Sequence, residues 1–117
     1  MKVFVAAAFL LLTPLAAHAA CSATDFAIKD FKPAPAGNGR MSLRGVLVNN
    51  CAAAAAAQVR IDLKDSSGKV VQSKQAWPAG TSNINPGDSV NFDLGRMFHA
   101  TPDVDSITAT VADVRTW

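Results

Sequence analysis

Residues 58–68, QVRIDLKDSSG, carry the strongest indication of fold class, because polar and apolar side chains alternate until a turn sequence ends the pattern. In an extended chain Val59, Ile61 and Leu63 share one face, whereas a helix would spread them around its axis. The tetrapeptide DSSG contains residues that turns prefer, and its glycine can adopt a positive φ. Residues 69–77 then favour a returning strand, so this part of the chain predicts an antiparallel hairpin.

The same alternation recurs on both sides of the hairpin. Further strands are expected where every second residue is apolar, at residues 24–31, 41–49, 89–94 and 106–114. Loops are expected where prolines, glycines and asparagines gather, at residues 33–39, 78–80 and 83–88. Six or seven short strands with turns roughly every 8–12 residues are typical of a sandwich of two antiparallel sheets. We therefore predict an all-β fold.

Six consecutive alanines, Ala52 to Ala57, are the one place where helix propensity opposes this pattern. A helix this short is unstable alone, because forming its first turn is costly. Ala57 also continues the apolar alternation of residues 58–64. We expect a strand to begin near Ala56 and the preceding alanines to form a loop beside Cys51, with a short helical turn as the alternative.

The first twenty residues have the composition of a secretory signal peptide. Lys2 precedes an apolar run from Val3 to Leu12, and Ala17-His18-Ala19 matches an A-x-A cleavage site. The apolar run is about half the ~20 residues that a transmembrane helix needs. We therefore predict a signal peptide at 1–20, a β-sandwich domain at 21–117 and a periplasmic or secreted location. The alternative is a buried N-terminal helix.

The mature chain would contain two cysteines, Cys21 and Cys51. In an oxidising compartment such a pair is usually a disulfide, and two cysteines allow a single connectivity. The alternative is a lipoprotein with its lipid on Cys21. That pattern prefers leucine three residues earlier, where His18 stands, and it would leave Cys51 unpaired.

Charge and composition exclude several classes of partner. The formal net charge of +2 falls to about +1 once Lys2 is removed, so neither nucleic acid nor an anionic membrane is expected as a partner. No segment after the signal peptide is long and apolar enough to cross a membrane. No sequence motif indicates a cofactor.

The order of features from Leu43 to Leu94 resembles the bacterial FxLYD-type family of small immunoglobulin-like domains. The segments that carry the resemblance are LRGVLVNN at 43–50, VRIDLKDSSGKV at 59–70 and INPGDSVNF at 84–92. Lys64 stands where the family has an aromatic residue before the aspartate. The resemblance implies an immunoglobulin-like sandwich with an accessory role, outside the cytoplasm, and no shared catalytic residues.

Three groups of residues could support chemistry, and each group has a simpler structural explanation. Ser89, His99 and Asp103 could form a triad, but no nucleophile motif surrounds any serine. Asp103 and Asp105 could act as paired carboxylates, although turn-forming aspartates are the more ordinary interpretation. Copper could bind where a thioether and an imidazole are close together in sequence, the residues being Met97 and His99, with the distant Met41. We therefore expect no catalytic residue and no metal ligand.

Recognition through the surface is the remaining possibility. Trp77 and Trp117 each end a segment, where tryptophan either contributes to an interface or covers the open end of a sandwich. Arg40, Arg44 and Arg60 are predicted to face outward from adjacent strands, as a basic stripe for an acidic partner. The exposed edge strands could also accept a strand from a partner.

These observations predict an exported, non-catalytic binding or accessory module whose partner is another envelope or secreted protein. The alternative within binding is an inhibitor or immunity-type protein that blocks an extracellular enzyme. A small hydrolase and a copper carrier are the alternatives from other classes.

Overall fold

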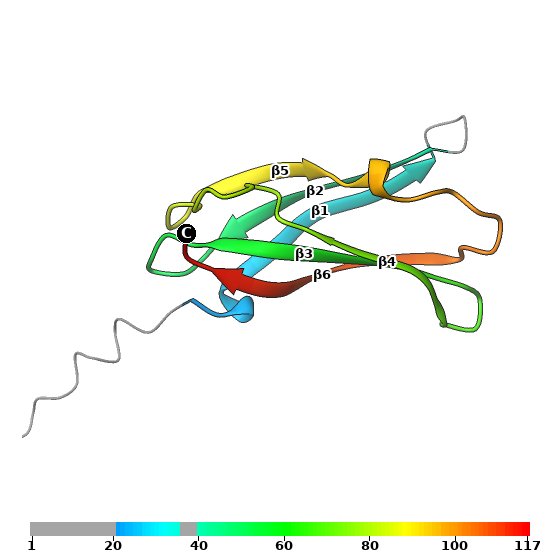
Figure 1. Cartoon of the computed structure of the whole chain (residues 1–117), viewed down its shortest axis with the longest axis horizontal. Coiled ribbons are helices and arrows are strands. Elements are labelled where there is room, and N and C mark those ends of the chain that lie inside the picture. The colour runs from blue at the N-terminus through cyan, green and yellow to red at the C-terminus, as the bar shows by residue number, and fades with distance from the viewer. Residues whose placement is uncertain (1–20, 36–39) are drawn as a thin grey trace, which may run out of the picture.

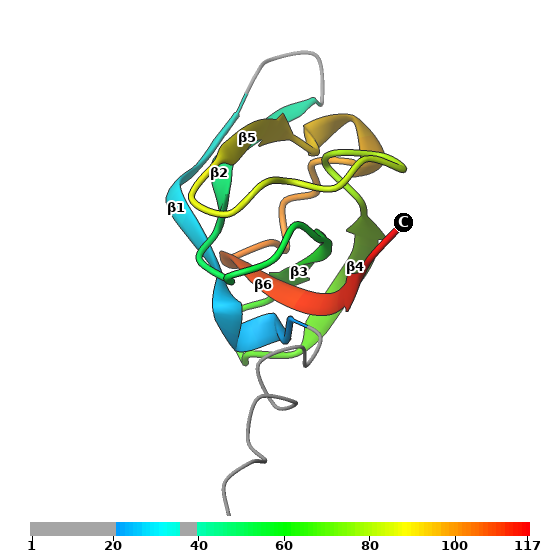
Figure 2. The same cartoon turned by 90° about the vertical axis from the view of Figure 1, so that its left-hand side faces the viewer.

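Six antiparallel strands form two three-stranded sheets that pack face to face (Figures 1 and 2). The structure is a computed structural model and describes residues 21–35 and 40–117. One sheet has the strand order β1-β2-β5 and the other the order β4-β3-β6. The strand bounds are β1 Phe26–Pro35, β2 Met41–Asn49, β3 Ala56–Lys64, β4 Val70–Ala76, β5 Ser89–Asp93 and β6 Ser106–Arg115. The prediction of a sandwich is confirmed at this level.

The core lies between the two central strands, β2 and β3. From Ala57 onward every second residue of β3 is buried, and all of these residues are apolar: Ala57, Val59, Ile61 and Leu63. Strand β2 contributes Leu43 and Leu47 from the opposite sheet. Central strands have neighbours on both sides, so their inward faces are covered more completely than those of edge strands. The predicted alternation is therefore confirmed most clearly here.

Gly45 of β2 leaves room for a large core residue. The ring of Phe92 on β5 lies so close that a Cβ added at Gly45 would come within 2.6 Å of its Cζ atom. Gly45 and Phe92 are cross-strand partners. Any larger residue at this position would have to displace the phenylalanine ring from the core.

The predicted hairpin is present, and the strand that follows the alanine run begins where it was expected. Strand β3 pairs with β4 through the turn at residues 65–69, where Gly68 has a φ of 86°. The Asp65 carboxylate accepts hydrogen bonds from the backbone N–H groups of Ser67 and Lys69, which closes the turn. Strand β3 begins at Ala56, and Ala55 makes an isolated bridge to Ile84.

Strand β1 differs from the prediction at both ends. Ala23–Asp25 form a short 3-10 turn, η2, because the Ser22 N–H donates to the Asp25 carboxylate. The prolines expected in a loop lie in the strand, since β1 continues to Pro35, with Pro33 opposite Leu43. Because β1 is an edge strand, half of its N–H groups have no strand to meet, and proline is tolerated. Residues 36–39 of the predicted loop are outside the described residues.

A disulfide joins Cys21 to Cys51 at one end of the sandwich, as predicted, with the two Cα atoms 5.8 Å apart. The bond uses the Cys21 sulfur, which is the atom that a lipid anchor would need. The predicted signal peptide, residues 1–20, lies outside the described residues. In the described part of the chain, no helix is long and apolar enough to span a membrane.

Candidate functional site

The two tryptophans, which are far apart in the sequence, meet on the surface at the disulfide end. The ring centroids of Trp77 and Trp117 are 5.7 Å apart and the rings are nearly perpendicular, with an interplanar angle of 74°. The guanidinium carbon of Arg115 lies 4.7 Å from the Trp117 ring centroid and 5.5 Å from that of Trp77. We call these three side chains the aromatic cluster. Its contacts combine an edge-to-face aromatic pair with a cation stacked on both rings.

Strand pairing explains why the cluster forms. Strands β4 and β6 flank β3 and both run antiparallel to it, so both end at the edge of the sheet where β3 begins. Figure 1 shows this sheet with the C-terminus at that edge. Trp77 directly follows β4, and Arg115 is the last residue of β6. Asn83 fixes the position of Trp117, because its Oδ1 accepts from the Trp117 N–H at 2.9 Å and its Nδ2 donates to the Trp117 carbonyl at 3.3 Å.

The cluster is open to solvent. Trp117 remains 45% exposed, and Trp77 is half-buried. Sequence reasoning found both tryptophans but missed Arg115. The available signal was its position two residues before Trp117, since side chains two apart in an extended chain point to the same side.

The predicted arginine stripe is wrong in one member. Arg44 lies on β2 and Arg60 on β3, and these strands belong to opposite sheets, so the two side chains face away from each other. The chain crosses from one sheet to the other between β2 and β3, which sequence adjacency alone did not reveal. Arg40 stays near Arg44, and Arg96, which sequence reasoning missed, joins them.

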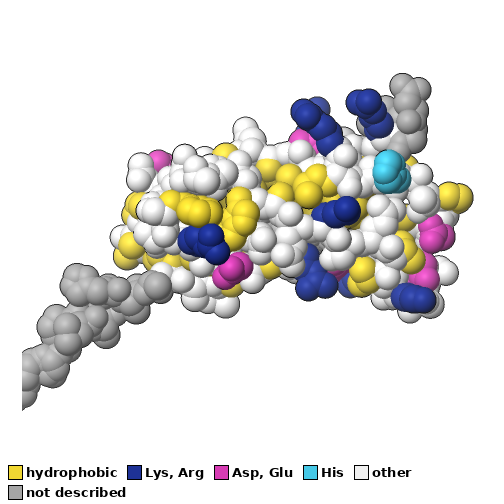
Figure 3. Space-filling model, in the orientation of Figure 1, with side chains coloured by type: hydrophobic (Ala, Val, Ile, Leu, Met, Phe, Trp, Pro, Cys, Tyr) yellow, Lys and Arg dark blue, Asp and Glu magenta, His cyan; other side chains and the backbone are white. Residues whose placement is uncertain are grey.

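Together they form what we call the arginine pocket, at the end of the sandwich opposite the disulfide. Its lining residues are Arg40, Met41, Ser42, Arg44, Asp93 and Arg96. Arg96 comes from η3, a short 3-10 turn at Gly95–Met97 that follows β5. Basic side chains gather at this end of the molecule, at the upper right of Figure 3.

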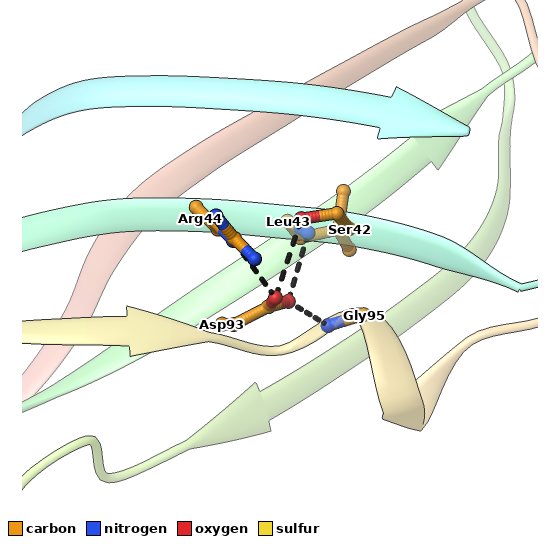
Figure 4. A network of polar contacts seen from close by, with 5 residues as sticks. All are labelled: Ser42, Leu43, Arg44, Asp93 and Gly95. Carbon is orange, nitrogen blue, oxygen red and sulfur yellow. Dashed lines mark hydrogen bonds and ion pairs between the residues drawn. The ribbon is translucent and has the colours of Figure 1, made fainter. Parts of the chain in front are cut away.

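Asp93 is the polar centre of the arginine pocket (Figure 4). One carboxylate oxygen accepts from the backbone N–H groups of Leu43 at 2.9 Å and Gly95 at 3.0 Å. The other accepts from the Ser42 hydroxyl at 3.2 Å and lies 3.4 Å from Arg44 Nε. Partial burial pushes the pKa of Asp93 upward, but the bonds from Leu43, Gly95, Ser42 and Arg44 outweigh it and hold the pKa below 3.8.

Arg60 belongs to a separate polar network on the outer face of the other sheet. Its Nε donates to Asp62 Oδ1 at 3.0 Å, and the Ser73 hydroxyl donates to the same oxygen. The Ser73 bond and the Arg60 charge lower the pKa of Asp62 against the opposing effect of burial. Arg60 therefore lies in a network of its own, apart from Arg40 and Arg44 on the other sheet.

The structure does not assemble the triad that the sequence offered. Ser89 begins β5 and His99 lies beyond η3, so the length of β5 separates them. The backbone N–H and carbonyl of His99 bond to the Gln72 side chain. Asp103 accepts from Thr101 within its own turn. Within residues 21–35 and 40–117, no three His, Cys, Asp or Glu side chains gather as metal ligands would.

The fold and these two surfaces define a disulfide-linked, two-sheet β-sandwich with an exposed aromatic cluster at one end and an arginine pocket at the other. No protein-family model, curated protein or solved structure matches the chain.

Proposed function

We propose that this chain is an exported, non-catalytic, immunoglobulin-like module that binds another envelope or secreted protein through the aromatic cluster. The observation that carries the proposal is the exposed Trp77–Arg115–Trp117 arrangement. Tryptophan and arginine are the residue types most enriched among interface hot spots, where a few side chains supply most of the binding energy.

The rigidity of the cluster supports the proposal. Binding is weakened when flexible side chains must be ordered at the interface. Here the Asn83 bonds hold the backbone at Trp117, and Arg115 stacks on both indole rings. The aromatic surface is therefore arranged before a partner arrives, and less conformational entropy is lost on binding.

The disulfide supports the location part of the proposal. Disulfides persist in oxidising compartments outside the cytoplasm and are rare within it. The Cys21–Cys51 bond is consistent with export by the predicted signal peptide and with a periplasmic or secreted role. The resemblance to FxLYD-type domains points the same way, toward an immunoglobulin-like accessory module.

Site-directed photo-crosslinking in the cells that make the protein tests this function. A photoreactive amino acid replaces Thr116, which is exposed between Arg115 and Trp117, and the control position is Thr110, which is exposed on the outer face of β6. We expect one discrete protein adduct from position 116 that is absent from position 110. Trp117→Ala in the same chain should remove it.

Two results would overturn the proposal: no adduct from position 116, or equal adducts from both positions. If the captured partner is a secreted enzyme whose activity falls when the domain is added, the partner is a target of inhibition, and the role is that of an inhibitor or immunity-type protein.

A further inference from the structure

The arginine pocket carries more positive charge than the structure neutralises. Three guanidinium groups and one carboxylate line it, which gives a formal charge of +3 − 1 = +2. Arg44 lies near Asp93, but among the described residues no carboxylate lies within 4.0 Å of Arg40 or Arg96. Lys32 is the cross-strand partner of Arg44 on β1 and adds a further positive charge to the same face.

The single acid of the pocket is already satisfied. Asp93 accepts from two backbone N–H groups, a hydroxyl and one guanidinium, so its charge is shared among four donors. Asp30 is the other nearby acid, and it lines a neighbouring hollow that shares Arg44 and Asp93 with the arginine pocket. The guanidinium groups that line this pocket repel one another, and an anion bound between them would offset the repulsion.

The donor set fits a tetrahedral oxyanion. Each guanidinium presents a planar fork of N–H donors that matches phosphate oxygens in pairs. The three forks come from separate backbone positions: the entry to β2, the middle of β2 and η3. A phosphate group offers acceptor oxygens in several directions, whereas a carboxylate offers two in one plane. Side chains from three positions therefore suit phosphate better.

We propose that Arg40, Arg44 and Arg96 form a binding site for a phosphate group. The pocket volume of about 320 Å³ is roughly ten times the ~30 Å³ that one water occupies, so a phosphate group and some of its hydration fit together. The site lies at the opposite end of the sandwich from the aromatic cluster, and it does not depend on the proposed protein partner.

The phosphate can be the free ion or part of an ester. Met41 lines the arginine pocket and also an adjoining apolar pocket with Pro33, Ala34, Ala100 and Ile107. An ester with a short carbon chain could use both pockets, whereas inorganic phosphate would use only the first. Comparing the two ligands distinguishes the sources.

The test is a titration of the isotope-labelled, disulfide-intact mature chain followed by amide NMR shifts at constant ionic strength. Inorganic phosphate should cause saturable shifts at Ser42, Leu43 and Gly95. Arg96→Gln and Arg40→Gln should each weaken binding roughly tenfold, the effect expected from losing a charge-assisted hydrogen bond. Both side chains are exposed, so the variants should fold.

Arg60→Gln is the matched control, because it removes the same charge from the opposite sheet and should leave phosphate binding unchanged. Tighter binding of hexyl phosphate would assign the site to an ester, and tighter binding of inorganic phosphate to the free ion. Shifts that never saturate, an equal loss in Arg60→Gln, or acetate binding as tightly as phosphate would each overturn the proposal.

Discussion

Two polar side chains organise opposite ends of the β1-β2-β5 sheet, and they do so with different chemistry. Asn49 ends β2 near the disulfide and is fully buried, with 0% exposure. Asp93 ends β5 beside the beginning of β2, and its side chain is 42% exposed. The first is a neutral amide enclosed by loops, and the second is a charged carboxylate at the rim of a basic pocket.

The Asn49 side chain hydrogen-bonds to backbone groups of the loops around it. Its Nδ2 donates to the carbonyls of Ala53 at 3.0 Å and Ile84 at 2.7 Å, and its Oδ1 accepts from the Cys51 N–H at 2.7 Å. The backbone of Asn49 also bonds to Gly87 and Asp88. Backbone groups withdrawn from water need hydrogen-bond partners, and one buried side chain bonds to three buried or partly buried groups here.

Asn49 and Asp93 serve different purposes: Asn49 stabilises the fold, whereas the surroundings of Asp93 remain available to bind a ligand. A buried neutral amide contributes fixed loop positions and leaves nothing free for a ligand. An exposed carboxylate holds a corner of the fold, but it leaves most of the neighbouring arginine charge facing solvent. The disulfide end should therefore determine the stability of the domain, and the arginine end should tolerate change.

Replacing Asn49 with alanine should have the largest effect. Three hydrogen bonds of a fully buried amide would be lost, each contributing about 1–1.5 kcal/mol, and the removed side chain would leave a cavity, so we expect the free energy of unfolding to fall by roughly 4–5 kcal/mol. Urea denaturation measures it. Asn91→Ala, at an exposed position on β5, is the control and should be nearly neutral. A loss under about 1 kcal/mol in Asn49→Ala would contradict the role of this side chain.

Removing the disulfide with Cys21→Ala and Cys51→Ala together should be the next largest effect. The bond closes a loop with a sequence separation of 30, for which chain entropy gives about 3.7 kcal/mol. Reduction of the parent protein should lower the free energy of unfolding by a similar amount, measured by urea denaturation. If the double variant and the parent unfold at the same urea concentration, the disulfide end does not determine stability.

The sequence predicted the strands of this comparison well, because alternation between buried and exposed positions is a local property. It did not predict which strands share a sheet, since that depends on where the chain crosses between layers. For this reason the prediction that Arg60 and Arg44 form one stripe is wrong, since they lie on opposite faces. Arg96 carried no periodic signal, because it lies in a turn between strands. Composition predicts a loop at Pro33, because it does not reveal that a strand lies at the edge of a sheet.

Asp93→Ala should have a smaller effect than either change at the disulfide end. Four donors lose an acceptor, but water can reach this partly exposed site and replace much of the lost bonding. We expect the free energy of unfolding to fall by about 1–2 kcal/mol in urea denaturation. Asp105→Ala, an exposed aspartate outside the pocket, is the control. A loss as large as that of Asn49→Ala would remove the distinction between the two ends.

Acidification should weaken the arginine end selectively and by the smallest amount. The pKa of Asp93 is lower in the folded chain than its ordinary 3.8, so its ionised form stabilises the fold at neutral pH. That contribution is present above the unfolded pKa and is lost as pH falls through the folded pKa. The interactions of Asn49 contain no titrating group. Lowering the pH from 7 toward 3 should therefore disturb the β5–η3 corner before the loops that Asn49 holds.

Hydrogen exchange at individual amides measures this difference directly. The N–H groups of Leu43 and Gly95 donate to Asp93, whereas that of Cys51 donates to Asn49. After correction for intrinsic rates, protection at Leu43 and Gly95 should fall between pH 5 and pH 3 while protection at Cys51 changes less. In Asp93→Asn the amide oxygen still accepts but does not titrate, so the selective loss should disappear. An equal fall at all three amides would mean that acid acts on the whole domain and not on Asp93.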